Sequence, residues 1–254
     1  MIFLYIFLAI LAIIALFFLF LYICGLFVNP NKEYEDDSKF YRFLLYSTTA
    51  LAIKILRIKI HTTGMEKIPT DTLPLFVGNH ISNYDPILQW HVLKKWNPAF
   101  ISKKANFSVP FYGRIIRRCC FLGIDRESPK KALLTINKAA RLIKKGEVSI
   151  GVYPEGTRSK NCKLLPLHSG VFLIAQKACV PIVVIATRGT ETIHKNYPFR
   201  RSDVYFDIVD VIPVEELKAV KTDIIGERVK NKLLEKLDGI PLAVSHEKEL
   251  TNGN

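Results

Sequence analysis

The segment from Met1 to Val28 is the feature that most constrains this chain, because it is almost wholly apolar and carries no charge. As an α-helix it would be about 42 Å long, whereas the hydrocarbon core of a bilayer is about 30 Å thick. A secretory signal peptide would need a basic start, a shorter apolar core and a small-residue cleavage site. Gly25, Asn29 and Pro30 end the run. The segment is therefore predicted to be a retained membrane anchor.

A second apolar stretch, residues 39–60, has an uncharged centre that is too short to span a bilayer. A helical projection places its basic side chains on one face and its larger apolar side chains on the other. The basic set is Lys39, Arg42, Lys54 and Arg57, and the apolar set is Phe40, Leu44, Leu51, Ile55 and Ile58. This pattern predicts an interfacial helix whose basic face meets lipid headgroups. The alternative is an amphipathic helix that covers the core of the following domain.

From residue 61 onward, short apolar runs alternate with helix-like stretches. The strand-like runs are 75–78, 98–102, 119–124, 148–153, 180–187 and 204–211, and the helix-like stretches are 86–95, 129–145, 170–179 and 222–237. Such alternation predicts an α/β fold with a largely parallel central sheet flanked by helices. The predicted domains are a membrane anchor over residues 1–60, formed by the two helices, and a catalytic domain over residues 61–254.

The net charge of the chain indicates which classes of partner it can attract. Its formal net charge is +13, and all 36 Lys and Arg residues follow Val28. A basic domain attracts anionic membranes and anionic small molecules, and basic residues after an anchor favour a cytoplasmic location. The sequence has neither zinc-finger spacing nor the aromatic–basic pattern of RNA-binding proteins, so we expect no nucleic-acid partner. The five cysteines are odd in number and lack C-x-x-C spacing, which argues against a disulfide framework or a zinc site.

One histidine and one aspartate stand five positions apart in Asn79-His80-Ile-Ser-Asn-Tyr-Asp85. The segment follows the strand-like run 75–78 and precedes a predicted helix that begins at Pro86. In a continuous helix these two side chains would point about 140° apart, but across a strand-to-helix turn they can meet. A carboxylate that orients an imidazole is the arrangement used in general-base catalysis. The alternative is that Asp85 is an ordinary helix N-cap before proline and that His80 is structural.

Two other predicted strands also end in polar turns, and α/β folds bind ligands at such ends. One turn carries Asp125 and Arg126, and the other is Tyr153-Pro-Glu-Gly-Thr-Arg-Ser159. Glycine allows close approach to a ligand, and arginine offers two parallel donors to a phosphate. The alternative for the second turn is a β-turn stabilised by ion pairs. A further apolar run, Val180-Pro-Ile-Val-Val-Ile-Ala186, carries no reactive side chain and is predicted to be a core strand.

Taken together, these stretches resemble the four sequence boxes of the 1-acyl-glycerol-3-phosphate acyltransferases, within the glycerophospholipid acyltransferase superfamily. The boxes correspond to 79–85 (His-x4-Asp), 122–126, 154–159 and 180–184, in the family's order, and the resemblance covers roughly residues 61–211. Two places depart from the family pattern. Lys103-Lys104-Ala105-Asn106 keeps the family's lysine but loses its acid, and His168-Ser169 stands where a lysine often precedes glycine.

The resemblance implies a role for each of these side chains. His80 would be the general base for the 2-hydroxyl of lysophosphatidic acid, and Asp85 would orient it. Arg126 and Arg158 would hold the acceptor phosphate, and Glu155 with Gly156 would position the glycerol. Thr157, Ser159 and Lys103 complete the expected substrate-binding set. The donor would be acyl-CoA or acyl-carrier protein, the product phosphatidic acid, and no cofactor or metal is expected.

The resemblance also implies an anchored enzyme, with its catalytic domain on the cytoplasmic face of the cell membrane and an anionic membrane as partner. Three alternatives stay open at this point. The acceptor could be another glycerol phosphate or lysophospholipid. The protein could be a thiol hydrolase with Cys119 or Cys120 as nucleophile, or a non-enzymatic basic membrane-binding protein. The acyl donor, the chain-length preference and the oligomeric state do not follow from the sequence.

Overall fold

The computed structural model describes residues 1–238, and its centre is a seven-stranded sheet with the strand order β1-β7-β6-β2-β5-β3-β4. The strands are β1 (Ile58–Thr63), β2 (Leu75–Gly78), β3 (Ala99–Lys103), β4 (Leu122–Ile124), β5 (Ile150–Val152), β6 (Ile182–Arg188) and β7 (Ser202–Ile212). Neighbouring strands are parallel except β6 and β7, which are antiparallel. The predicted α/β fold with a largely parallel sheet is therefore confirmed.

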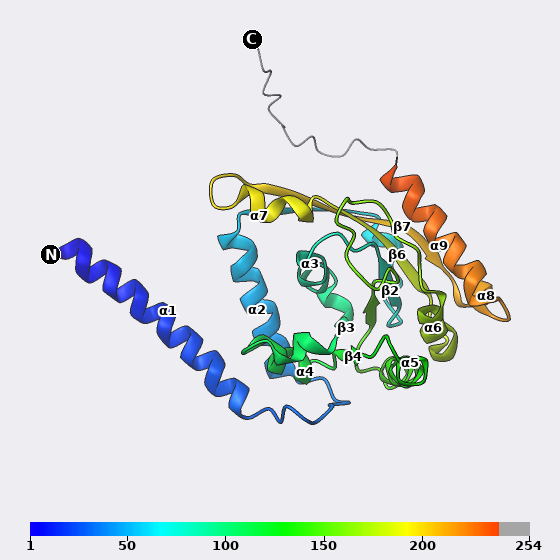
Figure 1. Ribbon diagram of the computed structural model, residues 1–254, viewed down its shortest axis with the longest axis horizontal. Coiled ribbons are helices and arrows are strands. Elements are labelled where there is room, and N and C mark those ends of the chain that lie inside the picture. The colour runs from blue at the N-terminus through cyan, green and yellow to red at the C-terminus, as the bar shows by residue number, and fades with distance from the viewer. Residues whose placement is uncertain (239–254) are drawn as a thin grey trace, which may run out of the picture.

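Helices cover both faces of this sheet (Figure 1). They are α1 (Ile2–Leu26), α2 (Lys39–Ile55), α3 (Tyr84–Val92), α4 (Tyr112–Arg118), α5 (Pro129–Lys144), α6 (Leu173–Ala178), α7 (Ile193–Asn196), α8 (Val214–Leu217) and α9 (Thr222–Leu237). Short 3-10 turns lie at Met65–Lys67, Lys94–Trp96, Lys104–Ser108, Ser169–Phe172 and Thr190–Thr192. Helix α5 begins as expected, because Ser128 accepts a hydrogen bond from Lys131 N and Pro129 occupies the first turn.

Alternate residues of the central strands point to opposite faces, and each face has its own apolar cluster. In β2, Leu75 and Val77 belong to a cluster that contains residues of α5, α6 and α9. Phe76 lies in a second cluster, together with Leu88 of α3 and residues of β1 and β7. The sheet is thus buried on both sides, so polar groups of the central strands reach solvent chiefly where a strand ends.

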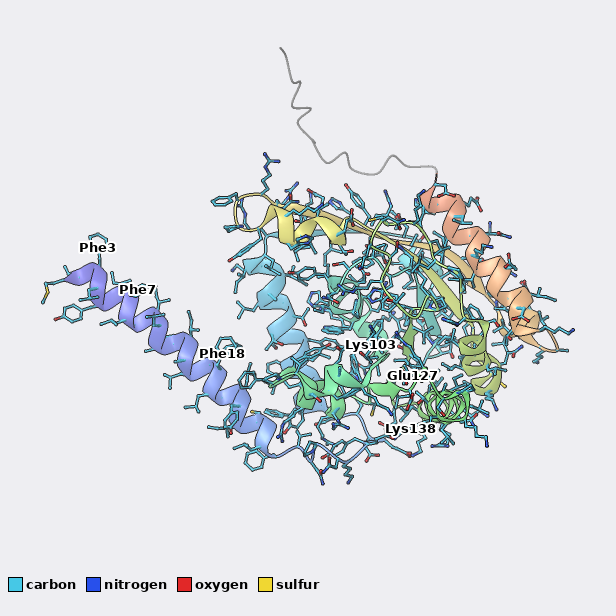
Figure 2. The ribbon with its side chains drawn as sticks, viewed as in Figure 1. Phe3, Phe7, Phe18, Lys103, Glu127 and Lys138 are labelled. Atoms are coloured by element: carbon cyan, nitrogen blue, oxygen red, sulfur yellow. The ribbon has the colours of Figure 1, made fainter. Side chains whose placement is uncertain are left out.

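Helix α1 extends away from the sheet and touches the remainder of the protein only near its carboxyl end (Figure 1). Its side chains from Met1 to Phe20 are exposed, and Figure 2 shows Phe3 and Phe7 projecting clear of the other elements. The helix is long and apolar enough to cross a membrane. Leu21, Cys24 and Val28 instead pack into the core of the domain.

The expected helix over residues 39–60 is wrong in its length and in its basic face. Helix α2 ends at Ile55, and β1 begins at Ile58, so the predicted boundary at residue 60 falls inside a strand of the sheet. Arg42 is buried: it pairs with Asp37 at 2.7 Å and donates to the carbonyl oxygens of Pro98 and Cys119. It therefore joins the helix to the domain and does not belong to an exposed basic face, and Arg57 lies beyond the end of the helix.

The outward face of α2 carries large apolar side chains beside the exposed Lys39 and Lys54. Leu44 and Leu45 face the core, as the alternative of a helix that covers the domain requires. The exposed set is Phe40, Phe43, Leu51 and Ile55. The alternative of a helix that covers the domain is thus confirmed for one face of α2, whereas contact of the other face with lipid stays a prediction.

Candidate active site

The turn that follows β2 is fixed to the neighbouring strand β6 by one buried side chain. Asn79 donates from Nδ2 to the carbonyl oxygen of Thr187 at 3.0 Å, and its Oδ1 accepts from Thr187 N at 2.7 Å. These paired bonds extend the ladder beyond the last regular residue of β2. The position of His80, the next residue, is therefore set by the sheet.

His80 and Asp85 meet across the strand-to-helix turn, as the sequence predicts. Nδ1 of His80 lies 2.8 Å from Oδ2 of Asp85. The Asp85 side chain is completely buried, while that of His80 is 18% exposed. Among the described residues Nε2 of His80 has no hydrogen-bond partner, so the nitrogen that could take a proton remains available. The geometry is that of an imidazole oriented by a carboxylate.

Asp85 is held by more donors than the sequence indicates. Its Oδ2 also accepts from the backbone N–H groups of Ile81 and Ser82, both at 2.7 Å. Its Oδ1 accepts a hydrogen bond of 2.5 Å from the hydroxyl of Thr190, which lies in the turn after β6. Asp85 is not the helix N-cap, which is Asn83. Its carboxylate closes the turn that carries His80, so the alternative of a simple cap is wrong.

Tyr153 forms one wall of the site beside the imidazole. Its ring stacks on that of His80, with centroids 4.4 Å apart and planes inclined by 17°. The ring of Phe100 stacks on its other side at 5.8 Å. The phenol oxygen is buried without a partner among the described residues, and burial raises the pKa of Tyr153 well above its usual range. Tyr153 therefore stays protonated and limits the rotation of His80.

Glu155 has a task different from the expected one. Its Oε1 accepts from the backbone N–H of His80 at 2.6 Å, and its Oε2 accepts from Leu165 N at 2.9 Å. The residue is 4% exposed. Burial raises the pKa of Glu155, although both backbone hydrogen bonds oppose this shift. Glu155 thus clamps the His80 turn, and its expected contact with glycerol stays a prediction.

Ser159 supports the same turn from the other side. Its backbone N–H donates to the carbonyl oxygen of His80 at 2.8 Å, and its hydroxyl donates to Asn161 at 2.9 Å. Its hydroxyl is therefore engaged within the protein, and its role in substrate binding stays a prediction. Gly156 adopts a φ of +69°, and a β-carbon there would lie 3.1 Å from the ring of His168. Both the backbone conformation and the close neighbour favour glycine at this position.

The predicted cationic residues are exposed, but they lie in two places. Arg158 and Thr157 belong to the turn that clamps His80. Lys103 lies at the end of β3, and Arg126 follows β4, the outermost strand (Figure 2). Because neighbouring strands are about 4.8 Å apart, β4 lies about 14 Å from β2. The structure thus brings Arg158 to the His80 turn, leaves Arg126 after the edge strand β4, and places Lys103 at the end of β3, between β5 and β4.

The two adjacent cysteines are unsuited to nucleophilic chemistry. Cys119 and Cys120 are completely buried. Burial raises the pKa of each thiol to about 12, so the thiolate is scarce at neutral pH. They pack in the apolar core as small side chains.

Comparison with known proteins gives a consistent result. The acyltransferase family model matches residues 59–188. A 1-acyl-sn-glycerol-3-phosphate acyltransferase of Haemophilus influenzae is 32% identical over 155 residues, covering 58% of this chain and 63% of that protein. A chloroplastic 1-acyl-sn-glycerol-3-phosphate acyltransferase of Brassica napus is 29% identical over 202 residues, covering 79% of this chain and 57% of that protein. The chain thus spans less than two thirds of the length of these relatives.

The fold is also shared with a solved structure. The crystal structure of the 1-acyl-sn-glycerophosphate acyltransferase PlsC from Thermotoga maritima matches with a TM-score of 0.64 and 22% identity, covering 78% of each chain. This similarity supports the arrangement of the sheet and its helices.

Proposed function

The chain belongs to the acyltransferase family, and from this premise we propose that it transfers an acyl group from a thioester to the 2-hydroxyl of 1-acylglycerol 3-phosphate. The product would be phosphatidic acid. The observation that carries the proposal is the His80–Asp85 pair, with Nδ1 bound to a buried carboxylate and Nε2 without a hydrogen-bond partner among the described residues.

In this mechanism Nε2 of His80 takes the proton of the acceptor hydroxyl as its oxygen attacks the thioester carbonyl carbon. The negative charge of Asp85 stabilises the imidazolium that forms. The tetrahedral intermediate then collapses, the carbon–sulfur bond breaks, and the imidazolium returns its proton to the departing thiolate. The acyl group passes directly to the acceptor, so the step needs neither an acyl-enzyme nor a redox cofactor.

The acceptor phosphate is assigned to the exposed cations. Arg158 belongs to the turn that also holds His80, which would place the phosphate near the reacting hydroxyl. Arg126, after the edge strand β4, and Lys103, at the end of the adjacent strand β3, would meet a more distant anionic group of the acceptor or of an acyl-CoA or acyl-carrier-protein donor. Helix α1 would anchor the enzyme in the cell membrane, with the basic domain on its cytoplasmic, anionic face.

An acyl-transfer assay tests the proposal and the choice of substrates. The full chain would be purified in mixed micelles and supplied with oleoyl-CoA or an oleoyl-carrier protein. The acceptors would be 1-oleoylglycerol 3-phosphate, glycerol 3-phosphate and 1-oleoyl-glycerophosphocholine, with products identified by mass spectrometry. We expect phosphatidic acid to dominate, and we expect it to disappear with His80→Ala. Folded protein that transfers no acyl group to the lysophosphatidate from either donor would contradict the proposal.

A further inference from the structure

A cavity of about 600 Å³ lies where the carboxyl end of α1 meets the turn before α4. Tyr22 and Leu26 of α1 line one side, and Phe107, Val109 and Phe111 line the other. Its volume falls within the range of small-molecule sites. It is formed by the anchor and the domain together, and none of the residues assigned to the His80 site lines it.

Two glycines allow the close contacts that shape this cavity. Gly25 allows Arg114 to reach α1, where Nη1 donates to the carbonyl oxygens of Gly25 and Val28 at 3.1 and 2.9 Å. Gly113 allows the turn to fold against α4, since a β-carbon there would lie 2.4 Å from the carbonyl oxygen of Phe107. The cavity therefore results from the packing of the carboxyl end of α1 against α4 and the turn before it, and these contacts fix its walls.

Arg117 lines the cavity, and its guanidinium lacks strong hydrogen-bond partners among the described residues. Its Nη1 makes one long contact of 3.5 Å to the carbonyl oxygen of Lys32, and its Nε is buried without a partner. The guanidinium lies 4.9 Å from the centre of the Phe107 ring. No carboxylate lines the cavity, and within residues 1–238 neither Arg117 nor Lys32 pairs with one. By contrast, the basic cavity beside α5 contains Glu33 and Asp125, which pair with Lys138 and Lys104.

The apolar side of the cavity continues along the anchor. Phe111 contacts Phe18 and Tyr22, with ring centroids 6.0 and 6.2 Å apart. Tyr22, Leu26 and Val109 are each more than two-fifths exposed. A helix of the length of α1 spans about 38 Å, more than the hydrocarbon core of about 30 Å, so an inserted α1 places its carboxyl end at the depth of lipid phosphates.

We propose that this cavity binds one anionic glycerophospholipid of the membrane, with its phosphate on Arg117 and its acyl chains along Phe18, Tyr22 and Leu26. Such a lipid would join the anchor to the catalytic domain. The guanidinium of Arg117 matches the phosphate of such a lipid, and the apolar wall beside it matches the acyl chains. A purely polar ligand would leave the apolar wall without a partner. The proposal concerns lipid binding alone and does not depend on acyl transfer.

Native mass spectrometry of the full chain can test this site. Protein in detergent would be mixed with equal amounts of dioleoyl-phosphatidylglycerol and dioleoyl-phosphatidylcholine, which differ only in the headgroup. We expect at least tenfold preferential retention of one phosphatidylglycerol. Both lipids carry a phosphate, but the quaternary ammonium of phosphatidylcholine offsets its negative charge beside the cationic Arg117 and Arg114, whereas phosphatidylglycerol keeps a net charge of −1. Arg117→Gln should remove the preference, whereas Arg200→Gln, the same change at an exposed distant site, should leave it intact.

A second variant separates loss of the site from loss of the fold. Val109→Trp would fill the cavity from an exposed position while keeping Arg117, and it should reduce retention of phosphatidylglycerol by a similar factor. Thermal unfolding would confirm that each variant is folded. Unchanged preference in both folded variants would overturn the proposal. So would a wild-type protein that retains 1-oleoylglycerol 3-phosphate far better than phosphatidylglycerol, since the cavity would then serve the acceptor.

Discussion

The hydroxyl of Thr190 donates a hydrogen bond of 2.5 Å to the carboxylate of Asp85, although the two residues are 105 positions apart. Both residues are completely buried. Thr190 donates to Oδ1 of Asp85, and groups of the His80 turn donate to Oδ2, so both carboxylate oxygens have hydrogen-bond donors. Thr190 thereby connects the turn after β6 to the orientation of His80 and acts as a positioning residue.

Thr190→Val should keep the shape of this buried side chain while it removes the donor. We expect kcat to fall about tenfold, as for the loss of one hydrogen bond to a charged group, with little change in the acceptor KM. Thr190→Ser keeps the hydroxyl and should restore kcat.

Thr192→Val is the matched control for this experiment. Thr192 lies in the same 3-10 turn, and its hydroxyl donates to the carbonyl oxygen of Gly189 at 2.8 Å, away from Asp85. This variant should keep the wild-type kcat. A kcat that is equally unchanged in Thr190→Val would show that Thr190 only packs.

Asp85→Asn should separate charge from geometry. The asparagine amide oxygen can accept the hydrogen bonds that Oδ2 of Asp85 accepts from the His80 turn. The amide nitrogen can donate to the hydroxyl of Thr190, which can accept as well as donate. The variant should therefore fold normally and bind acceptor. Loss of the negative charge should lower kcat by roughly 10², within the range typical of general acid–base catalysis. Circular dichroism and steady-state kinetics would check both parts, and full turnover would exclude the dyad.

Arg158→Ala should weaken binding of the acceptor more than binding of the donor. The side chain is exposed, forms no ion pair among the described residues and belongs to the turn that clamps His80. Loss of charge-assisted bonds of about 1.5–3 kcal/mol predicts a rise of about tenfold or more in acceptor KM. Lys160→Ala, which removes a neighbouring exposed cation, is the control. Equal rises for donor and acceptor would contradict the phosphate assignment.

A chain that lacks residues 1–20 should still bind vesicles through the apolar face of α2. The deletion spares Leu21 and Val28, which pack in the core. Phe43 and Leu51 are exposed on α2, while Arg42 is buried, so binding should survive high salt. Phe43→Ser should reduce it roughly tenfold, as expected for one large apolar side chain. Vesicle flotation at low and high salt would measure this. Binding that is lost in salt and indifferent to Phe43→Ser would favour electrostatic attachment instead.

The sequence predicts those parts of the site that depend on neighbouring residues along the chain. His80 and Asp85 are five positions apart, and the change from strand to helix between them suffices to bring them together. Helix α9 has the predicted bounds, and strands β2 and β3 lie close to their predicted positions. In each case a local pattern of apolar residues, caps or glycine determines the structure.

Contacts between distant segments could not be predicted in the same way. Nothing near Thr190 indicates that its hydroxyl meets Asp85, and Glu155 carries no local sign that its two oxygens accept backbone hydrogen bonds. The end of α2 was missed because the apolar periodicity continues into β1, while the break is a positive φ of 54° at Arg57. A non-glycine residue in that conformation is set by the tertiary structure and has no signature in composition.

The pairing of β1 with β7 imposes an order on the biosynthesis of this protein. Thr63 and Asp207, which are hydrogen-bonded across these strands, are 144 positions apart. At about 5–20 residues per second a ribosome needs roughly 7–30 s to make that interval. Throughout this time β1 lacks its partner strand, whereas α1 and α2 are already synthesised. The edge of the sheet formed by β1 therefore closes last, after α1, α2 and the strands β2 to β6 have all been synthesised.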